Sequence, residues 1–260
     1  MTTMGARHAG DVMVQESRRN PAPSGLHYQI IKNWDEVVNF VDNFLPELVD
    51  NECYYIELFS RKKYDRRIPN SDTCNLVRHI ATTPDGILRA LRKMEVAYGT
   101  YYLKDTVVSQ ESLAVYITTS PRCRKKATFS LMKTLLEKIS RNEEVFPHSA
   151  ALTAIHRSRS RPCFVTFDID TEDIDGFDQI QIFGAIRDEV GDEAVNVIKT
   201  RGGYHLLIDP KKVVSKHKNW HEHIKGIVKP DQTGDILSPI PGCVQGSHVP
   251  YMVVQSGKDR

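Results

Sequence analysis

Two aspartates at the end of an apolar run could share a metal ion. The segment CFVTFDIDTED, residues 163–173, places Asp168 and Asp170 two positions apart. Its first half is rich in aromatic and branched residues, which predicts a strand. Side chains alternate along a strand, so both carboxylates point to one face. Because the two charges repel each other, the pair favours a Mg²⁺ or Mn²⁺ ion. An acidic turn in solvent beyond the strand is the alternative.

A glycine pair and a histidine form a second candidate motif, KTRGGYHLLID at residues 199–209. Gly203 and the glycine before it allow a ligand to approach the backbone closely, and Lys199 and Arg201 add positive charge. His205 then enters an apolar strand. This combination predicts a site for a polyphosphate group. The alternative is a β-hairpin with a Gly-Gly turn, in which the histidine only packs in its strand.

A third motif supplies another carboxylate. Asp235 precedes an apolar run in TGDILSPIPGCVQGSHVPYMV, residues 233–253. Together with Asp168 and Asp170 it completes a set of three candidate catalytic and metal-binding aspartates, since hard divalent cations prefer oxygen ligands.

Three short basic runs are candidates for contacts with nucleic-acid phosphates. They are SRKKYDRR, PRCRKK and HRSRSR, at residues 60–67, 121–126 and 156–161. The cations selected from the first two are Arg61, Lys62, Lys63, Arg122, Lys125 and Lys126. Tyr64 lies among them and could stack on a base. Each run alone would also suit an ordinary solvated surface.

Histidines also cluster in HKNWHEH, residues 217–223. His217 and His221 are four positions apart and could share one face of a helix as zinc ligands. No cysteine or third remote ligand is evident from the sequence, so an exposed polar helix is the favoured interpretation.

The composition indicates an ordinary folded protein. The chain has 260 residues, a net charge of +2 and 26% charged residues, so any affinity for nucleic acid must come from local clusters. Its five cysteines are scattered and include no Cys-x-x-Cys pair, which argues against a disulfide framework or a cysteine zinc site. We find neither a membrane-spanning run nor a signal peptide, and therefore expect a cytoplasmic protein without membrane partners.

Expected strands and helices alternate along the chain, which predicts an α/β or α+β fold. Strands are expected at residues 53–59, 99–104, 113–120, 163–168, 195–200 and 204–209. One helix is expected to begin after Asn33 and to end before Pro46. Further helices are expected around residues 84–97, 128–140, 177–190 and 211–228. Residues 1–25 have the composition of a disordered tail. Residues 26–260 are expected to form one domain, with an N-terminal lobe at 26–112 and a motif-bearing lobe at 113–254.

In this order, the motifs resemble the archaeo-eukaryotic primase superfamily, which includes primase-polymerases and the polymerase domains of bacterial end-joining ligases. The family's strand ending in Asp-x-Asp is similar to CFVTFDID, its glycines before a histidine to TRGGYHLL, and its isolated aspartate to Asp235. IPGCVQGS looks like the turn after that aspartate, with Cys243 and Ser247 replacing a threonine and a glycine. VYITTSPRCRKKA resembles a strand followed by Asn-Pro-Arg, with Ser120 in place of asparagine. The resemblance covers residues 113–254.

The resemblance implies a fold, an activity and a site. The implied fold is a two-lobed α/β (α+β) primase-polymerase catalytic core with an RRM-like antiparallel sheet flanked by helices. The implied activity is nucleotidyl transfer, synthesising DNA or RNA on a template from nucleoside triphosphates. Asp168, Asp170 and Asp235 would hold two Mg²⁺ or Mn²⁺ ions. His205 would contact the phosphates of the incoming nucleotide, with Lys199, Arg201 and Gly203 nearby.

Two other classes of function stay open at the sequence level. A nuclease, phosphohydrolase or nucleotide-modifying transferase could use the same aspartates. A non-catalytic nucleic-acid-binding module could keep the fold alone. For the polymerase function, the expected partner is a single-stranded or primed template. The sequence contains no Gly-x-x-x-x-Gly-Lys-Ser/Thr motif, so unwinding a duplex would require a separate helicase.

Overall fold

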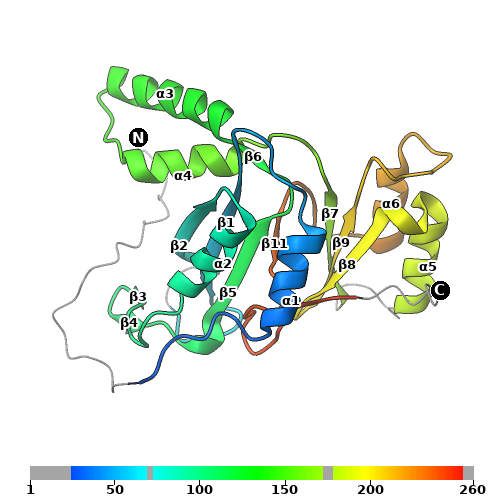
Figure 1. Cartoon of the computed structure of the whole chain (residues 1–260), viewed down its shortest axis with the longest axis horizontal. Helices are drawn as coiled ribbons and strands as arrows, with labels where there is room; N and C mark the ends of the chain where they lie inside the picture. The colour runs from blue at the N-terminus through cyan, green and yellow to red at the C-terminus, as the bar shows by residue number, and fades with distance from the viewer. Residues whose placement is uncertain (1–24, 69–72, 172–177, 254–260) are drawn as a thin grey trace, which may run out of the picture.

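A computed structural model describes residues 25–68, 73–171 and 178–253. The described residues form two five-stranded antiparallel sheets, a small two-stranded ribbon and six α-helices (Figure 1). The expected mixed α+β class is therefore confirmed. Of the expected disordered tail, residues 1–24 lie outside the described residues. No helix in the described ranges is long and apolar enough to cross a membrane.

The first sheet has the strand order β11-β5-β1-β2, and β6 pairs with the start of β1. Its strands are β1 (Glu52–Arg61), β2 (Thr73–Ala81), β5 (Leu113–Thr118), β6 (Arg122–Cys123) and β11 (Leu237–Pro239). Strand β1 is buried almost continuously because both faces of this sheet are covered. Helices α1 and α2 contribute to the core on one face, and helix α4 packs against Cys53 and Tyr55 on the other.

The helices of the first half begin at side-chain caps that the sequence supplies. Helix α1 (Trp34–Asn39) starts where the Asn33 side chain accepts a hydrogen bond from the Glu36 amide, as expected. A π-helical turn, Phe40–Phe44, continues it to the residues before Pro46. Helix α2 (Pro84–Lys93) is capped by Thr83 and ends four residues earlier than the expected 84–97. The two-stranded ribbon of β3 (Tyr102–Leu103) and β4 (Thr106–Val107) follows it.

The second sheet has the strand order β10-β7-β9-β8-β12. Its strands are β7 (Val165–Asp170), β8 (Val195–Lys199), β9 (Gly203–Ile208), β10 (Gln232–Gly234) and β12 (Tyr251–Met252). Helices α5 (Gln179–Val190) and α6 (Trp220–Val228) connect β7 to β8 and β9 to β10. The chain order β7-α5-β8-β9-α6-β10 with this strand order is the split βαβ arrangement of ferredoxin-like sheets.

The two faces of the second sheet have different neighbours. Phe167, Ile169 and Leu206 pack under helices α5 and α6. Side chains alternate along a strand, so Asp168 and Asp170 lie on the opposite face. On that face Ile198 and Leu207 join the core of the first sheet. The predicted motifs on β7 and β9 therefore face the junction between the two sheets.

Three features of the fold differ from the sequence predictions. Strand β5 begins at Leu113 but pairs with β1, so the expected lobe boundary at 112/113 does not separate the two sheets. Strand β2 and helix α4 (Pro147–Arg157) were not expected.

Helix α4 forms a hairpin with α3 (Arg124–Ser140), which stands at one end of the first sheet (Figure 1). Helix α3 exposes an apolar stripe of Phe129, Met132, Leu136 and Ile139.

Candidate functional site

Asp168 and His205 lie opposite each other on neighbouring strands of the second sheet. The register of β7 against β9 pairs these two residues directly. His205 Nε2 lies 3.2 Å from Asp168 Oδ1, and the histidine is only 5% exposed. Its other ring nitrogen, Nδ1, lies 3.3 Å from the hydroxyl of Ser238 on β11. The Asp168–His205 pair thus sits where the two sheets meet, and both ring nitrogens have partners.

The charge of Asp168 is stabilised by its surroundings. Burial alone would raise the pKa of this carboxyl, but the hydrogen bond and electrostatic interaction with His205 and the positive charges of Lys63 and Arg61 outweigh burial and lower it. Asp168 is therefore ionised at neutral pH. A carboxylate in this state is the form that binds a divalent cation.

The turn before β9 requires its glycines. Asp170 pairs with Gly203 across the sheet. A Cβ at Gly203 would lie 1.8 Å from the backbone oxygen of Ile169, which no real structure tolerates. A Cβ at Gly202 would lie 2.9 Å from Asp170 Oδ1. The glycines therefore let the β8–β9 turn approach the Asp170 carboxylate closely.

Three cations surround the ring of Tyr64 near this junction. The guanidinium carbons of Arg201 and Arg61 lie 4.4 and 5.5 Å from the ring centroid, and Lys63 Nζ lies 5.7 Å from it. Arg61 also donates a hydrogen bond of 2.8 Å to the Tyr116 hydroxyl. The same Lys63 and Arg61 act on Asp168. We call Arg61, Lys63, Tyr64 and Arg201 the basic cluster; it joins two predicted motifs that are far apart in the sequence.

One atom of the basic cluster has no partner among the described residues. The Nε atom of Arg61 is buried and makes no hydrogen bond within residues 25–68, 73–171 and 178–253. A buried guanidinium nitrogen without a partner is costly. Gln245, which the sequence did not single out, completes the arrangement: it accepts a hydrogen bond from the Arg201 amide and donates one to Tyr116.

Asp235 does not join Asp168 and Asp170 in this structure. It directly follows β10, whose last residue, Gly234, pairs with Thr166 near the far end of β7. The guanidinium of Arg122 binds both carboxylate oxygens of Asp235, one of them at 3.1 Å. The three aspartates are not among the described groups whose ligand atoms all lie within 4.8 Å of one another.

The same ion pair changes the interpretation of Arg122. This residue is 1% exposed, although the sequence suggested a contact with nucleic acid. Its position allows no exposed contact with a phosphate backbone, so a structural role within the fold explains it better. Arg159 Nε also approaches Asp235, at 3.9 Å, and adds to the positive potential around this carboxylate.

Lys199 lies on the wrong face of the sheet for the predicted phosphate contact. It pairs with Tyr204, one residue before His205. Its Nζ atom lies 4.1 Å from the centre of the Tyr204 ring, and that ring packs in the core beneath α5 and α6. The structure therefore separates Lys199 from the motif that contains His205, whereas Arg201 lies with the basic cluster.

The remaining predicted phosphate contacts divide into two places. Lys62 and Lys63 follow β1; Lys63 is exposed and belongs to the basic cluster, and Lys62 is its neighbour in the chain. Lys125 and Lys126 are exposed in the first turn of α3. Lys126 donates to the carbonyl oxygens of Arg159 and Ser160, at 3.2 and 3.4 Å. The two pairs of lysines do not form one continuous cluster.

Divalent metal ions fit part of the predicted ligand set. Asp168 and Asp170 share a strand face, and the glycine turn before β9 lies against the Asp170 carboxylate. Asp235 does not fit as a third ligand in this arrangement, because the buried guanidinium of Arg122 neutralises it. The residues present therefore suit one ion bound by two carboxylates and completed by oxygens from a substrate.

Comparisons with known proteins add no family to these observations: no family model, no curated protein and no solved structure matches the chain significantly.

Proposed function

We propose that the protein is a metal-dependent nucleotidyltransferase of the primase-polymerase type, which extends DNA or RNA on a template from nucleoside triphosphates. The observation that supports this most is the junction of the two sheets, where the Asp168–His205 pair meets the basic cluster. A carboxylate pair for a metal ion and cations for phosphates in one place are what nucleotidyl transfer requires. The ferredoxin-like strand order of the second sheet agrees with the RRM-like sheet of the proposed fold.

In this proposal each residue has a defined role. Asp168 and Asp170 hold Mg²⁺ or Mn²⁺, which supplies activation of the attacking hydroxyl and neutralises phosphate charge. When the nucleotide binds, His205 Nε2 gives up its contact with Asp168 and donates a hydrogen bond to a phosphate oxygen instead. Arg61, Lys63 and Arg201 stabilise the negative charge of the triphosphate as it shifts to the leaving group. Tyr64, held among these cations, orients their charged groups.

Asp235 has a different role from the one that the resemblance implies. As long as Arg122 binds both oxygens of its carboxylate, Asp235 anchors β10 and β11 to β6. A second metal ion at this aspartate requires that the Arg122 guanidinium first move away. The proposal therefore assigns one metal site to this conformation.

A second candidate function is a non-catalytic nucleic-acid-binding module. The observation that favours it is that two aspartates of the acidic motif already have partners within the protein: His205 contacts Asp168, and Arg122 pairs with Asp235. In such a module the basic cluster would bind a phosphate backbone, and the aspartates would serve only the stability of the fold.

Templated extension distinguishes these two functions. The chain and its Asp168→Asn/Asp170→Asn variant are incubated with Mn²⁺, a primed or unprimed single-stranded template, and ribo- or deoxyribonucleoside triphosphates. The proposal expects a metal-dependent product from the parent and none from the variant. Template binding by both proteins, measured in parallel by fluorescence anisotropy, with no product from either would favour the binding module.

A further inference from the structure

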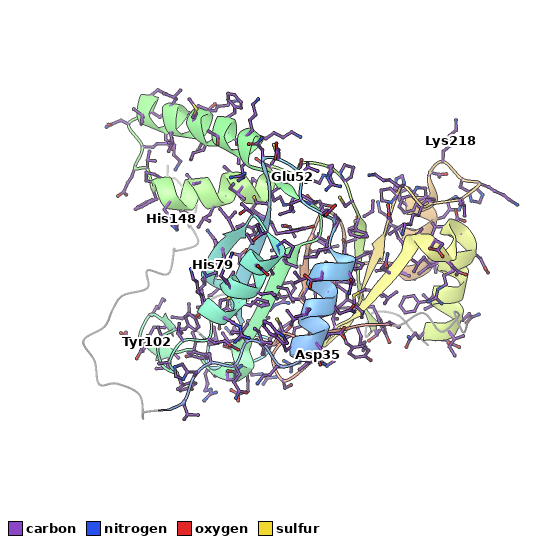
Figure 2. All side chains as sticks on the ribbon, in the orientation of Figure 1. Asp35, Glu52, His79, Tyr102, His148 and Lys218 are labelled. Carbon is purple, nitrogen blue, oxygen red and sulfur yellow. The ribbon has the colours of Figure 1, made fainter. Side chains whose placement is uncertain are left out.

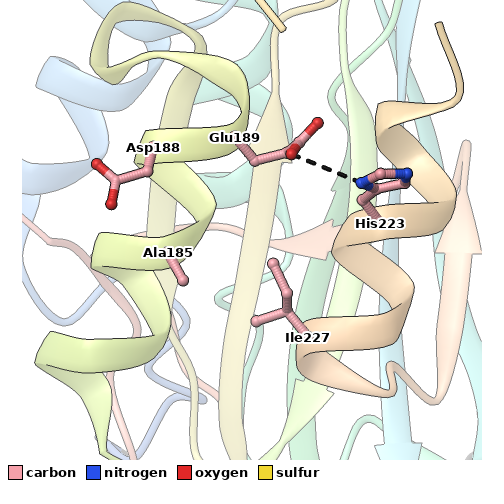
Figure 3. A pocket seen from close by; sticks show the side chains of 5 residues that line it. All are labelled: Ala185, Asp188, Glu189, His223 and Ile227. Carbon is pink, nitrogen blue, oxygen red and sulfur yellow. Dashed lines mark ion pairs between the residues drawn. The ribbon is translucent and has the colours of Figure 1, made fainter. Parts of the chain in front are cut away.

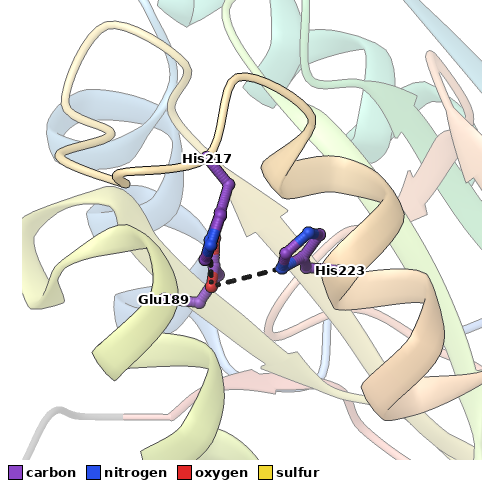
Figure 4. Close-up of side chains that lie close together, drawn as sticks. All are labelled: Glu189, His217 and His223. Carbon is purple, nitrogen blue, oxygen red and sulfur yellow. Dashed lines mark hydrogen bonds and ion pairs between the residues drawn. The ribbon is translucent and has the colours of Figure 1, made fainter.

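Glu189, His217 and His223 converge on the helical side of the second sheet. Glu189 belongs to α5, His223 to α6, and His217 to the segment between β9 and α6 (Figure 4). One ligand atom from each lies within 4.8 Å of the other two. Among the His, Cys, Asp and Glu side chains of the described ranges, this is the group of three that meets this distance. The Lys218 side chain next to it projects outward from the molecule (Figure 2).

The distances suit a tetrahedral transition-metal ion. His217 Nδ1 lies 3.0 Å from Glu189 Oε1, and His223 Nδ1 lies 3.7 Å from Glu189 Oε2. Bonds of about 2.0–2.1 Å to Zn²⁺ place tetrahedral ligand atoms roughly 3.4 Å from one another. The two observed distances lie on either side of this value. Small rotations of the side chains would therefore bring three ligands around one ion.

The surroundings of Glu189 support a ligand role. The Ser215 hydroxyl donates a hydrogen bond of 2.6 Å to Glu189 Oε1, which fixes the orientation of the carboxylate as outer-shell partners of metal ligands do. The carboxylate is thus oriented before any ion binds.

A pocket beside the group offers space for a fourth ligand. It has a volume of about 410 Å³ and is lined by Ala185, Asp188, Glu189, His223 and Ile227 (Figure 3). Solvent can therefore reach the point between Glu189 and His223. Three protein ligands and one water molecule complete a four-coordinate zinc site.

The pairing differs from the one that the sequence suggested. His217 and His221 are four residues apart in the sequence, but His217 precedes the start of α6 at Trp220. His221 Nε2 instead lies 3.4 Å from Glu222 Oε1, outside the group. His223 is thus the residue that joins His217, with their ring centres 4.1 Å apart.

We propose that Glu189, His217 and His223 bind one Zn²⁺ ion, which fastens the segment before α6 to helices α5 and α6. The site lies on the helix-covered side of the sheet, opposite the face that carries Asp168 and His205. Its role is structural and independent of nucleotidyl transfer. Without the ion, the two histidines and the glutamate keep only hydrogen bonds that water can replace.

Metal uptake by the full chain tests this site directly. The metal-free protein is titrated with Co²⁺, whose visible absorption reports four-coordinate nitrogen and oxygen ligands, and Zn²⁺ then displaces it. Because Asp168 and Asp170 form a separate proposed metal site, we expect one equivalent to bind in the Asp168→Asn/Asp170→Asn variant and its melting temperature to rise with Zn²⁺. His217→Ala or His223→Ala should weaken binding by more than about 100-fold, because loss of an outer-shell partner alone costs about 10–100-fold. His221→Ala, which changes a histidine in the same helix as His223, is the matched control and should bind the metal ion as tightly as the parent does.

The outcome is separable from that of the proposed function. The Asp168→Asn/Asp170→Asn variant should keep Zn²⁺ uptake at Glu189, His217 and His223, since Asp168 and Asp170 lie on the other face of the sheet. The proposal is overturned if the parent takes up no Co²⁺ or Zn²⁺ at neutral pH. It is also overturned if the His217→Ala/His223→Ala double variant, shown to be folded by circular dichroism, binds the ion as tightly as the parent.

Discussion

Replacing Asp235 should damage stability, because its partner is a buried guanidinium. In Asp235→Ala the Arg122 side chain, 1% exposed, loses both carboxylate oxygens that it binds. Its Nε atom already has no partner in the part of the chain that the structure describes. Removing one member of a buried pair costs about 3–5 kcal/mol, since a charge remains without compensation. For a domain of this size, each kcal/mol corresponds to about 2–4 °C. We therefore expect the melting temperature to fall by about 6–20 °C.

Urea denaturation and thermal melting of three proteins measure this effect. They are the parent, Asp235→Ala, and the double variant Arg122→Met/Asp235→Ala, in which an apolar chain replaces the buried charge. The double variant should recover part of the loss, because a coupled pair is not additive. The reasoning is refuted if Asp235→Ala is as stable as the parent while its metal binding is abolished. That result would make Asp235 a metal ligand, as the sequence resemblance implies.

Three further predictions follow from the site. Gly203→Ala should lose about 1–3 kcal/mol of stability in urea denaturation because its Cβ would collide with Ile169. Gly184→Ala is the control and should gain about 0.5–1 kcal/mol, since beyond its own stretch of helix no described atom lies within 4 Å of the added Cβ. Equal effects of both would contradict this. His205→Gln should raise the KM for nucleoside triphosphate more than the dissociation constant for Mn²⁺, and the reverse order would argue for a metal ligand. The pKa of Asp168 is lowered from its usual 3.8, so its stabilising contribution is present above that pH and is lost as the pH falls through the folded-state pKa. Stability of Asp168→Asn should accordingly fall less steeply than the parent's in acid melts, and identical slopes would contradict the argument.

Local sequence patterns were sufficient for the elements that carry the motifs. The apolar run ending in Asp-x-Asp predicted β7, and the apolar runs on either side of the Gly-Gly pair predicted β8 and β9. Asn33 marked the start of α1 because capping depends on residues only three positions away. In these segments hydrophobic periodicity and turn chemistry agree with the final structure.

What the sequence did not show depends on pairing between distant segments. Arg122 and Asp235 are 113 residues apart, and nothing local marks them as partners. The register of β8 against β9 decides that Lys199 and His205 lie on opposite faces, and a shift by one residue would reverse this. Strand β2 was missed because its identity as a strand depends on pairing with β1. His223 was missed as a partner of His217 because helical spacing does not apply before α6 begins.

Mn²⁺ binding measured by electron paramagnetic resonance, with a non-hydrolysable nucleoside triphosphate present, tests the central claim most directly. A His217→Ala/His223→Ala background removes the second proposed metal site from the signal. The account predicts that Asp168→Asn/Asp170→Asn abolishes the bound Mn²⁺ and that Arg122→Met/Asp235→Ala, if folded, retains it with the nucleotide phosphates in its coordination shell. Binding that survives loss of Asp168 and Asp170, or that disappears only with Asp235, would contradict the account.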